Sequence, residues 1–262
     1  MNNTRVGVDL AKDVIQVCIF TNNKVLSNTE MTPSEFSLWL INTKPVTIVF
    51  EACGTSNYWK QVAIAAGHDA KLICPKLVSS VRQKQKTDKN DAFAIVQASF
   101  IPGITFITGK NIEQQQLQSM MRLRELAVKQ KTALNNQLGS LLLEFNIRFS
   151  SRTGGLRGAI ASVLEDAENG LSSLFRAALK TAWEQYLFIL KSIETYDEGL
   201  VKAIASHPEC QRLLKLEGVG TLNAINLYIA LGCCELGVFS KGKDASACIG
   251  VTPIPNLLQD AG

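Results

Sequence analysis

The amino-terminal third of the chain alternates residue patterns typical of strands with patterns typical of helices. Residues 5–11 (RVGVDLA) and 14–21 (VIQVCIFT) are rich in apolar and β-branched side chains, and the NNKV that follows indicates a hairpin turn into a third short strand. Further short apolar runs predict strands, and apolar residues at helical spacing predict helices. These strands are expected at residues 46–52 and 69–75, and the helices at residues 32–42 and 55–67.

Local signals define the ends of both predicted helices. Thr32 is placed as an N-cap, with Pro33 in the first helical position and Glu35 completing a capping box, and Gly67 ends the second helix. Three strands in a hairpin series, followed by alternating helix and strand, predict a mixed α/β sheet with helices packed on it. This is the order of elements in a ribonuclease H-like domain.

The pattern becomes wholly helical after residue 109. Residues 111–206 contain no proline, and apolar residues recur at heptad-like spacing over 117–145 and 174–205. We therefore expect two long helices, interrupted around SSRTGGLRG at residues 150–158. An antiparallel helical pair and an oligomerising coiled coil both fit this periodicity.

The segment at residues 207–232 carries two glycines, Gly218 and Gly220, between short helical runs. Turns of this kind resemble a helix-hairpin-helix, whose backbone amides and helix N-terminus can accept a nucleic-acid phosphate. A tight turn inside a helical core is the alternative interpretation.

The overall composition is that of a globular protein. Hydrophobic residues make up 46% of the 262 residues and charged residues 19%, and no apolar run is long enough for a membrane helix. The first residues show no basic-then-apolar leader, so we expect no signal peptide, no membrane partner and a cytoplasmic location. The seven cysteines form no C-x-x-C pair and there are only two histidines, so reduced core cysteines are expected rather than a zinc site or disulfides.

The positive charge is concentrated in one part of the chain. The net charge is only +4, yet six basic residues and a single acid, Asp88, lie between residues 71 and 89. Such a stripe is the electrostatic signature of phosphate binding, although a solvated helix face gives the same pattern. The basic residues are Lys71, Lys76, Arg82, Lys84, Lys86 and Lys89.

Four acidic residues stand out by their position in the predicted elements. Asp9 lies within the first strand and Glu51 ends the strand at residues 46–52, where a charge is costly unless it is paired or binds a cation. Asp88 and Asp91 are three residues apart at a helix start, so they share one helix face. For this last pair, N-capping by Thr87 and the helix dipole offer an alternative explanation.

Together, two acids at strand ends and two on one helix face match the needs of a pair of hard divalent cations. Magnesium prefers oxygen ligands, and a two-metal site can activate a nucleophile on one side of a phosphodiester and stabilise the leaving oxygen on the other. The lysines beside Asp88 would then hold the nucleic-acid backbone.

Three motifs follow one another in a fixed order: VGVDLAKD at residues 6–13, VFEACGTS at 49–56 and KTDKNDAFAI at 86–95. They precede a helical middle and the segments LEGVGTLNAINLYIALG and ASACIGVTP. This ordered set resembles, over nearly the whole chain, the DEDD transposases of insertion sequence family 110, the bridge-RNA-guided recombinases. The third motif is the most specific.

The resemblance implies a RuvC-like catalytic domain at residues 1–108, a helical coiled-coil region at 109–206 and an incomplete carboxy-terminal transposase domain at 207–262. It also implies DNA and a structured guide RNA as partners, assembly into dimers or tetramers, and two Mg²⁺ ions. By motif match, the metal-binding and catalytic tetrad falls on Asp9, Glu51, Asp88 and Asp91. The candidate nucleic-acid-binding residues are Lys12, Lys76, Arg82, Lys84, Lys86, Lys89, Gly218 and Gly220.

The family's serine nucleophile has no counterpart in this sequence. It belongs a short way after a G-[LV]-[TV]-P segment, whereas here residues 250–253 are followed only by IPNLLQDAG. Ser240 and Ser246 precede the segment, and the role is transferred to neither. We therefore expect a chain truncated at its carboxy terminus that keeps the metal site and RNA affinity but cannot complete recombination.

The leading hypothesis is thus a DNA transposase, a site-specific recombinase that cleaves and exchanges DNA strands with magnesium under the guidance of an RNA. A metal-dependent Holliday-junction nuclease that acts through the four carboxylates without a serine is one alternative. A non-catalytic remnant that binds nucleic acid or oligomerises with intact copies is another.

Overall fold

The computed structural model describes residues 4–83, 85–148, 155–232 and 241–250. The chain divides into two compact units: of the described residues, those of 4–114, 229–232 and 241–250 belong to the first, and those of 115–228 to the second.

A five-stranded sheet forms the centre of the first unit, with the strand order β3-β2-β1-β4-β5. β1, β2 and β3 pair antiparallel in a hairpin series, whereas β1, β4 and β5 pair parallel. The predicted mixed sheet is therefore confirmed. The strands are β1 (Arg5–Leu10), β2 (Ile15–Thr21), β3 (Lys24–Met31), β4 (Thr47–Glu51) and β5 (Asp69–Ile73).

The turn between β2 and β3 has the backbone that its sequence predicts. Asn22 and Asn23 both have positive φ angles, 49° and 60°. Two successive left-handed residues match the right-handed twist of the paired strands, and asparagine tolerates this conformation better than most residues.

Helices cover both faces of the sheet. They are α1 (Pro33–Asn42), α2 (Ser56–Ala65), α3 (Pro75–Val81) and α4 (Asp88–Ser99). The capping box of Thr32 and Glu35 is present at α1, and the side chain of Thr87 accepts a hydrogen bond from the Asn90 amide at the start of α4. α3 is not among the elements predicted from the sequence.

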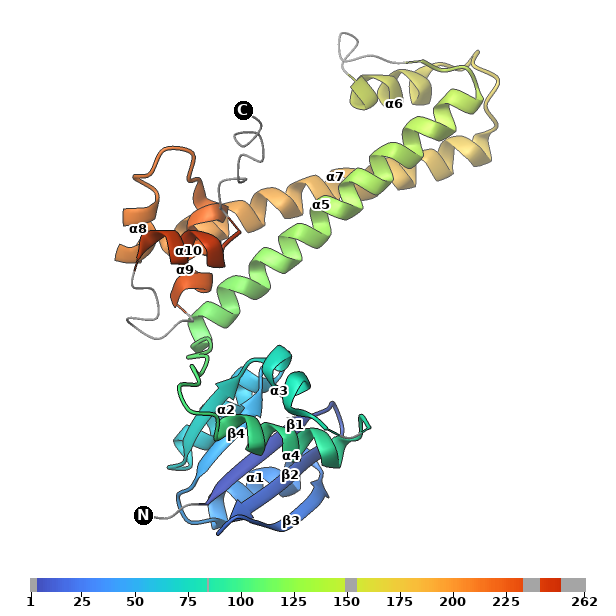
Figure 1. The fold of residues 1–262 in the computed structure, drawn as a ribbon. Helices are drawn as coiled ribbons and strands as arrows, with labels where there is room; N and C mark the ends of the chain where they lie inside the picture. Colours follow the sequence, from blue (N-terminus) through green and yellow to red (C-terminus); the bar gives the residue numbers. More distant parts are fainter. Residues whose placement is uncertain (1–3, 84, 149–154, 233–240, 251–262) are drawn as a thin grey trace, which may run out of the picture. The chain divides into compact units, whose positions relative to one another are not determined.

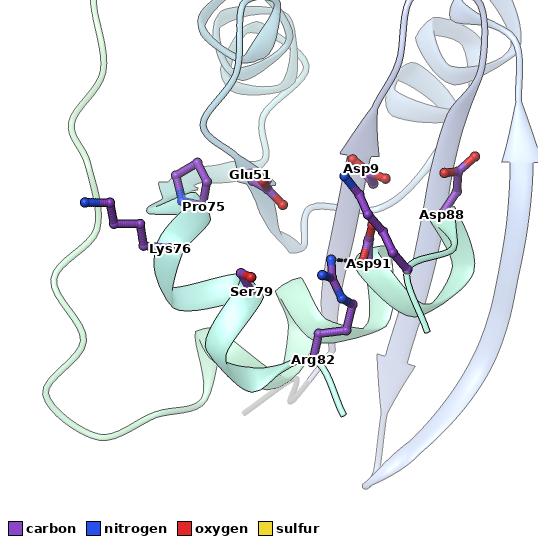
Figure 2. A pocket seen from close by; sticks show the side chains of 9 residues that line it. Asp9, Glu51, Pro75, Lys76, Ser79, Arg82, Asp88 and Asp91 are labelled. Carbon is purple, nitrogen blue, oxygen red and sulfur yellow. Dashed lines mark hydrogen bonds and ion pairs between the residues drawn. The ribbon is translucent and has the colours of Figure 1, made fainter. Parts of the chain in front are cut away.

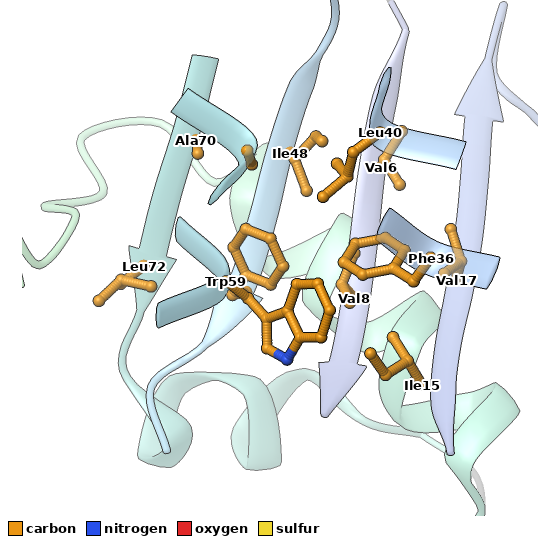
Figure 3. Close-up of a cluster of buried hydrophobic side chains, with 12 residues drawn as sticks. Val6, Val8, Ile15, Val17, Phe36, Leu40, Ile48, Trp59, Ala70 and Leu72 are labelled. Carbon is orange, nitrogen blue, oxygen red and sulfur yellow. The ribbon is translucent and has the colours of Figure 1, made fainter. Parts of the chain in front are cut away.

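The alternation of side chains along each strand separates two cores. Ile48 and Phe50 of β4 pack with α1 and α2, where Phe36 and Trp59 lie edge to face with ring centroids 5.1 Å apart (Figure 3). Val49, between them, packs against α3 and α4 on the other face. Because successive strand residues point to opposite faces, one short strand contributes to both cores.

α4 lies in direct contact with the backbone of β1 at Gly7. A Cβ atom at Gly7 would collide with the carbonyl oxygen of Ala92 and come within 2.7 Å of Val96 Cγ2. Only glycine therefore allows the helix to approach this closely.

The second unit is helical. Its elements are α5 (Ile112–Glu144), α6 (Gly155–Glu165), α7 (Ser173–Ile204), α8 (Pro208–Leu213) and α9 (Thr221–Gly232). The start of α5, up to Gln114, and the end of α9, from Ile229, belong to the first unit, as does α10 (Gly242–Cys248). The two predicted long helices are α5 and α7, and the shorter α6 between them was not predicted. None of the described helices combines the length and apolar content needed to cross a membrane.

α5 and α7 run antiparallel within the chain (Figure 1). Arg124 of α5 forms an ion pair with Asp197 of α7, and further along α5 the buried Leu138 shares an apolar cluster with Leu179 of α7. The partner position on α7 thus decreases as the position on α5 increases. Oligomerisation through this region stays a prediction.

The close contact at Gly7 predicts a large effect from a single methyl group. Gly7→Ala should lower the free energy of unfolding by about 1–3 kcal/mol, because the added methyl group forces α4 away from β1. Urea denaturation followed by circular dichroism measures this loss. Gly54→Ala is the matched control, because a Cβ atom there meets nothing within 4 Å; equal stability of the two variants would contradict the close packing.

Candidate metal centre

All four acids singled out from the sequence line one pocket, with a volume of about 590 Å³ (Figure 2). β1 and β4 are parallel neighbours, so their carboxyl ends meet at the same edge of the sheet, where Asp9 and Glu51 lie. The first turn of α4 adds Asp88 and Asp91. The other lining residues are Pro75, Lys76, Ser79, Arg82 and Lys86.

The backbone explains why these side chains converge. Asp9 lies two residues after Gly7, so it projects from the face of the sheet that α4 covers. Glu51 lies two residues after Val49, which packs on that same face. The close approach of α4 at Gly7 then brings the acids of its first turn to the same edge.

The pocket concentrates negative charge in a partly desolvated place. Burial raises the pKa of Asp9, and the neighbouring Asp91 and Asp88 raise it further. Burial also raises the pKa of Glu51, with additional contributions from Asp9 and Asp91, while Lys86 opposes both shifts. A cation in the pocket would relieve this repulsion.

Asp91 already has a cationic partner. Its Oδ1 accepts a hydrogen bond of 2.7 Å from Arg82 Nη1, with 10% of the Asp91 side chain and 22% of the Arg82 side chain exposed (Figure 2). In the described part of the chain, no three acidic, histidine or cysteine side chains are grouped closely enough to hold a metal ion. The acids therefore share a pocket without forming a closed ligand set, although their carboxylate oxygens are the donor type that Mg²⁺ prefers.

The candidate nucleic-acid-binding residues are spread more widely than the acids. Lys76, Arg82 and Lys86 line the pocket, whereas Lys12 and Lys89 are exposed and do not. Lys84 lies outside the described residues. Two more candidates, Gly218 and Gly220, lie in the second unit, in the turn before α9.

Sequence reasoning missed two residues of the pocket, Pro75 and Ser79. Both belong to α3, a helix of seven residues that follows β5 directly. The signal that could have identified it is the proline immediately after an apolar strand, since proline favours the first position of a helix.

The raised pKa of Asp9 predicts a pH-dependent gain in stability from Asp9→Asn. A folded state with a raised carboxyl pKa binds its proton more tightly than the unfolded chain, so wild-type stability falls as pH rises from the ordinary carboxyl range through the raised pKa. In EDTA, the variant should therefore melt above the wild type at pH 7, and the difference should shrink toward pH 4.

Melting temperatures measured from pH 4 to pH 8 provide the test. Asp13→Asn is the matched control, because Asp13 is exposed in the loop between β1 and β2 and does not line the pocket. Parallel pH profiles for the wild type and Asp9→Asn would contradict the proposed electrostatics.

Comparison with known proteins places the chain in a family. Residues 6–147 match the family of DEDD transposases typified by insertion sequence IS110, whose description is "Transposase". The transposase for insertion sequence element IS1111A of Coxiella burnetii is 30% identical over 249 residues, which are 95% of this chain and 68% of that protein. A probable family 20 transposase of Pseudomonas aeruginosa is 30% identical, covering 97% and 75% of the two chains.

Two further matches are more distant. The transposase for insertion sequence element IS1328 of Yersinia enterocolitica is 26% identical, covering 96% of this chain and 74% of that protein. A solved T. thermophilus RuvC in complex with a Holliday junction substrate is 13% identical with a TM-score of 0.29, covering 36% of this chain and 90% of that one. By its family match and its transposase relatives, the chain belongs to the DEDD transposases of the IS110 type.

Proposed function

We propose that this protein is a transposase that cleaves DNA strands with divalent cations held by Asp9, Glu51, Asp88 and Asp91. The observation that carries the proposal is the convergence of these four acids, from two strands and a helix, on one pocket that also contains basic side chains. Family membership supports the general activity of a transposase.

The proposed cofactor is Mg²⁺, with two ions. When bound, the ions would activate the attacking oxygen and stabilise the leaving oxygen of a phosphodiester. The carboxylates of Asp9 and Glu51 project from the paired strands β1 and β4, so their positions are fixed by the sheet. Asp88 and Asp91 are fixed by the capped first turn of α4. Rigid elements of this kind suit a site that must hold its ligands precisely.

The basic residues of the pocket have a complementary role in the proposal. Lys76, Arg82 and Lys86 offer positive charge to a phosphate backbone that lies across the acids. Arg82 neutralises Asp91 in the absence of a cation, and its planar guanidinium can donate to two phosphate oxygens once Asp91 has another partner.

A guide RNA and an assembly into dimers or tetramers complete the proposal, as the family resemblance implies. The turn at Gly218 and Gly220 supports a second nucleic-acid contact. Gly218 has a φ of +79°, and a Cβ atom at either glycine would meet nothing within 4 Å. Both backbones are therefore open to the approach of a phosphate.

A junction nuclease is the second candidate function. It is favoured by the pocket itself, in which four carboxylates and three basic residues occur together, the residue types that metal-dependent hydrolysis by water uses.

Neutralising the acids tests the metal centre. Asp88→Asn and Asp91→Asn should each lower Mg²⁺-dependent nicking of DNA by about 100-fold or more, because a lost ligand removes several kcal/mol of charge stabilisation in the transition state. Plasmid nicking measures the DNA cleavage proposed for the transposase, and cleavage of a four-way junction measures the activity of the junction nuclease. Each assay is run in Mg²⁺ and in EDTA. Mg²⁺ affinity is read by calorimetry on the same samples, with Asp13→Asn as the control. Unchanged affinity in a variant that lacks all four acids would refute the site.

Removing the positive charge of Arg82 tests the nucleic-acid contact. Arg82→Met should weaken DNA binding and lower the slope of log affinity against log salt by about 1, the value for one lost phosphate contact. Fluorescence anisotropy over a salt series measures the slope. Lys71→Met is the control, because Lys71 belongs to the same basic stripe but does not line the pocket. Equal slopes for the two variants would contradict the proposed contact.

A further inference from the structure

We propose that Gln16 and Asn28 are positioning residues for the metal centre, in a proposal that rests on the function proposed above. Their side-chain amides form a chain that connects β2 and β3 to the first turn of α4. This chain leaves one buried amide oxygen, Gln16 Oε1, without a hydrogen-bond donor, on the strand that pairs with the strand of Asp9.

The amide chain begins on the strand next to Asp9. Gln16 is the cross-strand partner of Asp9 in the pairing of β1 with β2. Directly opposite residues in an antiparallel pair project from the same face and lie about 4.5–5.5 Å apart at their Cβ atoms. Gln16 is only 1% exposed, so its side-chain amide is buried.

From there the chain crosses to α4. Gln16 Nε2 donates to Asn28 Oδ1 at 2.7 Å, and Asn28 Nδ2 donates to the backbone carbonyl oxygen of Lys89 at 2.9 Å. Lys89 lies between Asp88 and Asp91 in the first turn of the helix. The connection therefore reaches the backbone segment that carries two of the four acids.

The orientation of both amides follows from the last acceptor. A carbonyl oxygen can only accept, so Asn28 must turn its nitrogen toward Lys89 and its oxygen toward Gln16. Gln16 must then donate through Nε2, which leaves Oε1 for another donor. Among the described residues, Gln16 Oε1 is the one buried side-chain polar atom that lacks a hydrogen-bond partner.

A buried acceptor without a donor destabilises a protein, so a bound donor would stabilise Gln16 Oε1. Asp9 accepts as a carboxylate and cannot satisfy it. Mg²⁺ in proteins keeps several of its waters, and each of these waters is a strong donor. A water bound to a divalent cation held by Asp9 would be such a donor for Gln16 Oε1. Gln16 would orient the cation's water shell, and Asn28 would fix the helix turn that carries Asp88 and Asp91.

Metal affinity and metal-free stability, measured on the same variants of the full chain, test this role. Gln16→Met should weaken Mg²⁺ binding by about 10–100-fold, the usual effect of losing a hydrogen-bond partner of a metal's ligand shell. The melting temperature in EDTA should change little, because removal of the unpaired acceptor offsets the lost hydrogen bond to the half-buried Asn28. Gln61→Met is the matched control, because Gln61 Nε2 donates to the Lys110 carbonyl at 3.0 Å, while Gln61 lies in α2 and not on the strand that pairs with Asp9.

Asn28→Asp tests the anchoring role, in which Asn28 holds the first turn of α4, separately from the role of Gln16 toward the cation's waters. It also provides the test if Gln16→Met fails to fold. The aspartate keeps the acceptor for Gln16 and the size of the side chain, but it cannot donate to Lys89. Hydrogen exchange of the amides of residues 88–91 should be faster in this variant, and Mg²⁺ binding weaker. Unchanged exchange together with unchanged affinity would overturn the anchoring role.

The outcomes distinguish the positioning role from the metal centre on which it rests. Wild-type binding of Mg²⁺ that is lost in Asp9→Asn but retained in Gln16→Met would overturn the positioning role alone. A lower melting temperature of Gln16→Met in EDTA with normal Mg²⁺ affinity would assign the amide a purely structural role and would likewise overturn the positioning role. If the wild type binds no Mg²⁺, the metal centre and the positioning role fail together.

Discussion

The contact of α4 with the backbone of β1 at Gly7 is the constraint on which the site depends. A strand and a helix normally keep a layer of side chains between them, but here the carbonyl oxygen of Ala92 occupies the space of a Cβ atom. Asp9 follows Gly7 by two residues, and Asp88 and Asp91 precede Ala92 in α4. Close packing at one glycine thus determines the spacing of three of the four acids.

This arrangement places acidic side chains in a partly buried pocket, where their charges lower the stability of the fold. The pKa values of Asp9 and Glu51 are raised by burial and by the neighbouring acids, so their ionised forms oppose stability at neutral pH. Arg82 offsets the charge of Asp91, and the buried amide of Gln16 lacks a partner for its oxygen. Unfavourable charges and an unpaired buried acceptor are typical of sites that are completed by a ligand, and a bound cation would stabilise this one.

Much of the fold followed from local sequence. The capping box at Thr32, the asparagine turn at Asn22 and the helix start at Thr87 are each decided by a few neighbouring residues. The family resemblance rested on three ordered motifs and is confirmed by the match over residues 6–147. The grouping of the acids was a hypothesis from their positions, and the structure places them in one pocket.

The features that sequence reasoning missed depend on contacts between distant segments. The hydrogen bond from Asn28 to Lys89 spans 61 residues, and it requires the register of β3 on β2 together with the placement of α4. The pairing of Arg82 with Asp91 depends on how the segment after α3 returns to α4. A polar residue within a strand, such as Gln16, gives no local sign of its partner. Guidance by RNA was implied by the resemblance alone, and oligomerisation by the resemblance and by a periodicity that an antiparallel helical pair fits as well; both remain proposals.

The most direct measurement of the central claim is a crystal structure of the protein soaked in Mn²⁺, with the anomalous signal used to locate the ions. We predict anomalous peaks in the pocket, coordinated by oxygens of Asp9, Glu51, Asp88 and Asp91, with Arg82 turned away from Asp91. Peaks confined to other surfaces, with the pair of Arg82 and Asp91 intact at saturating Mn²⁺, would contradict the metal centre.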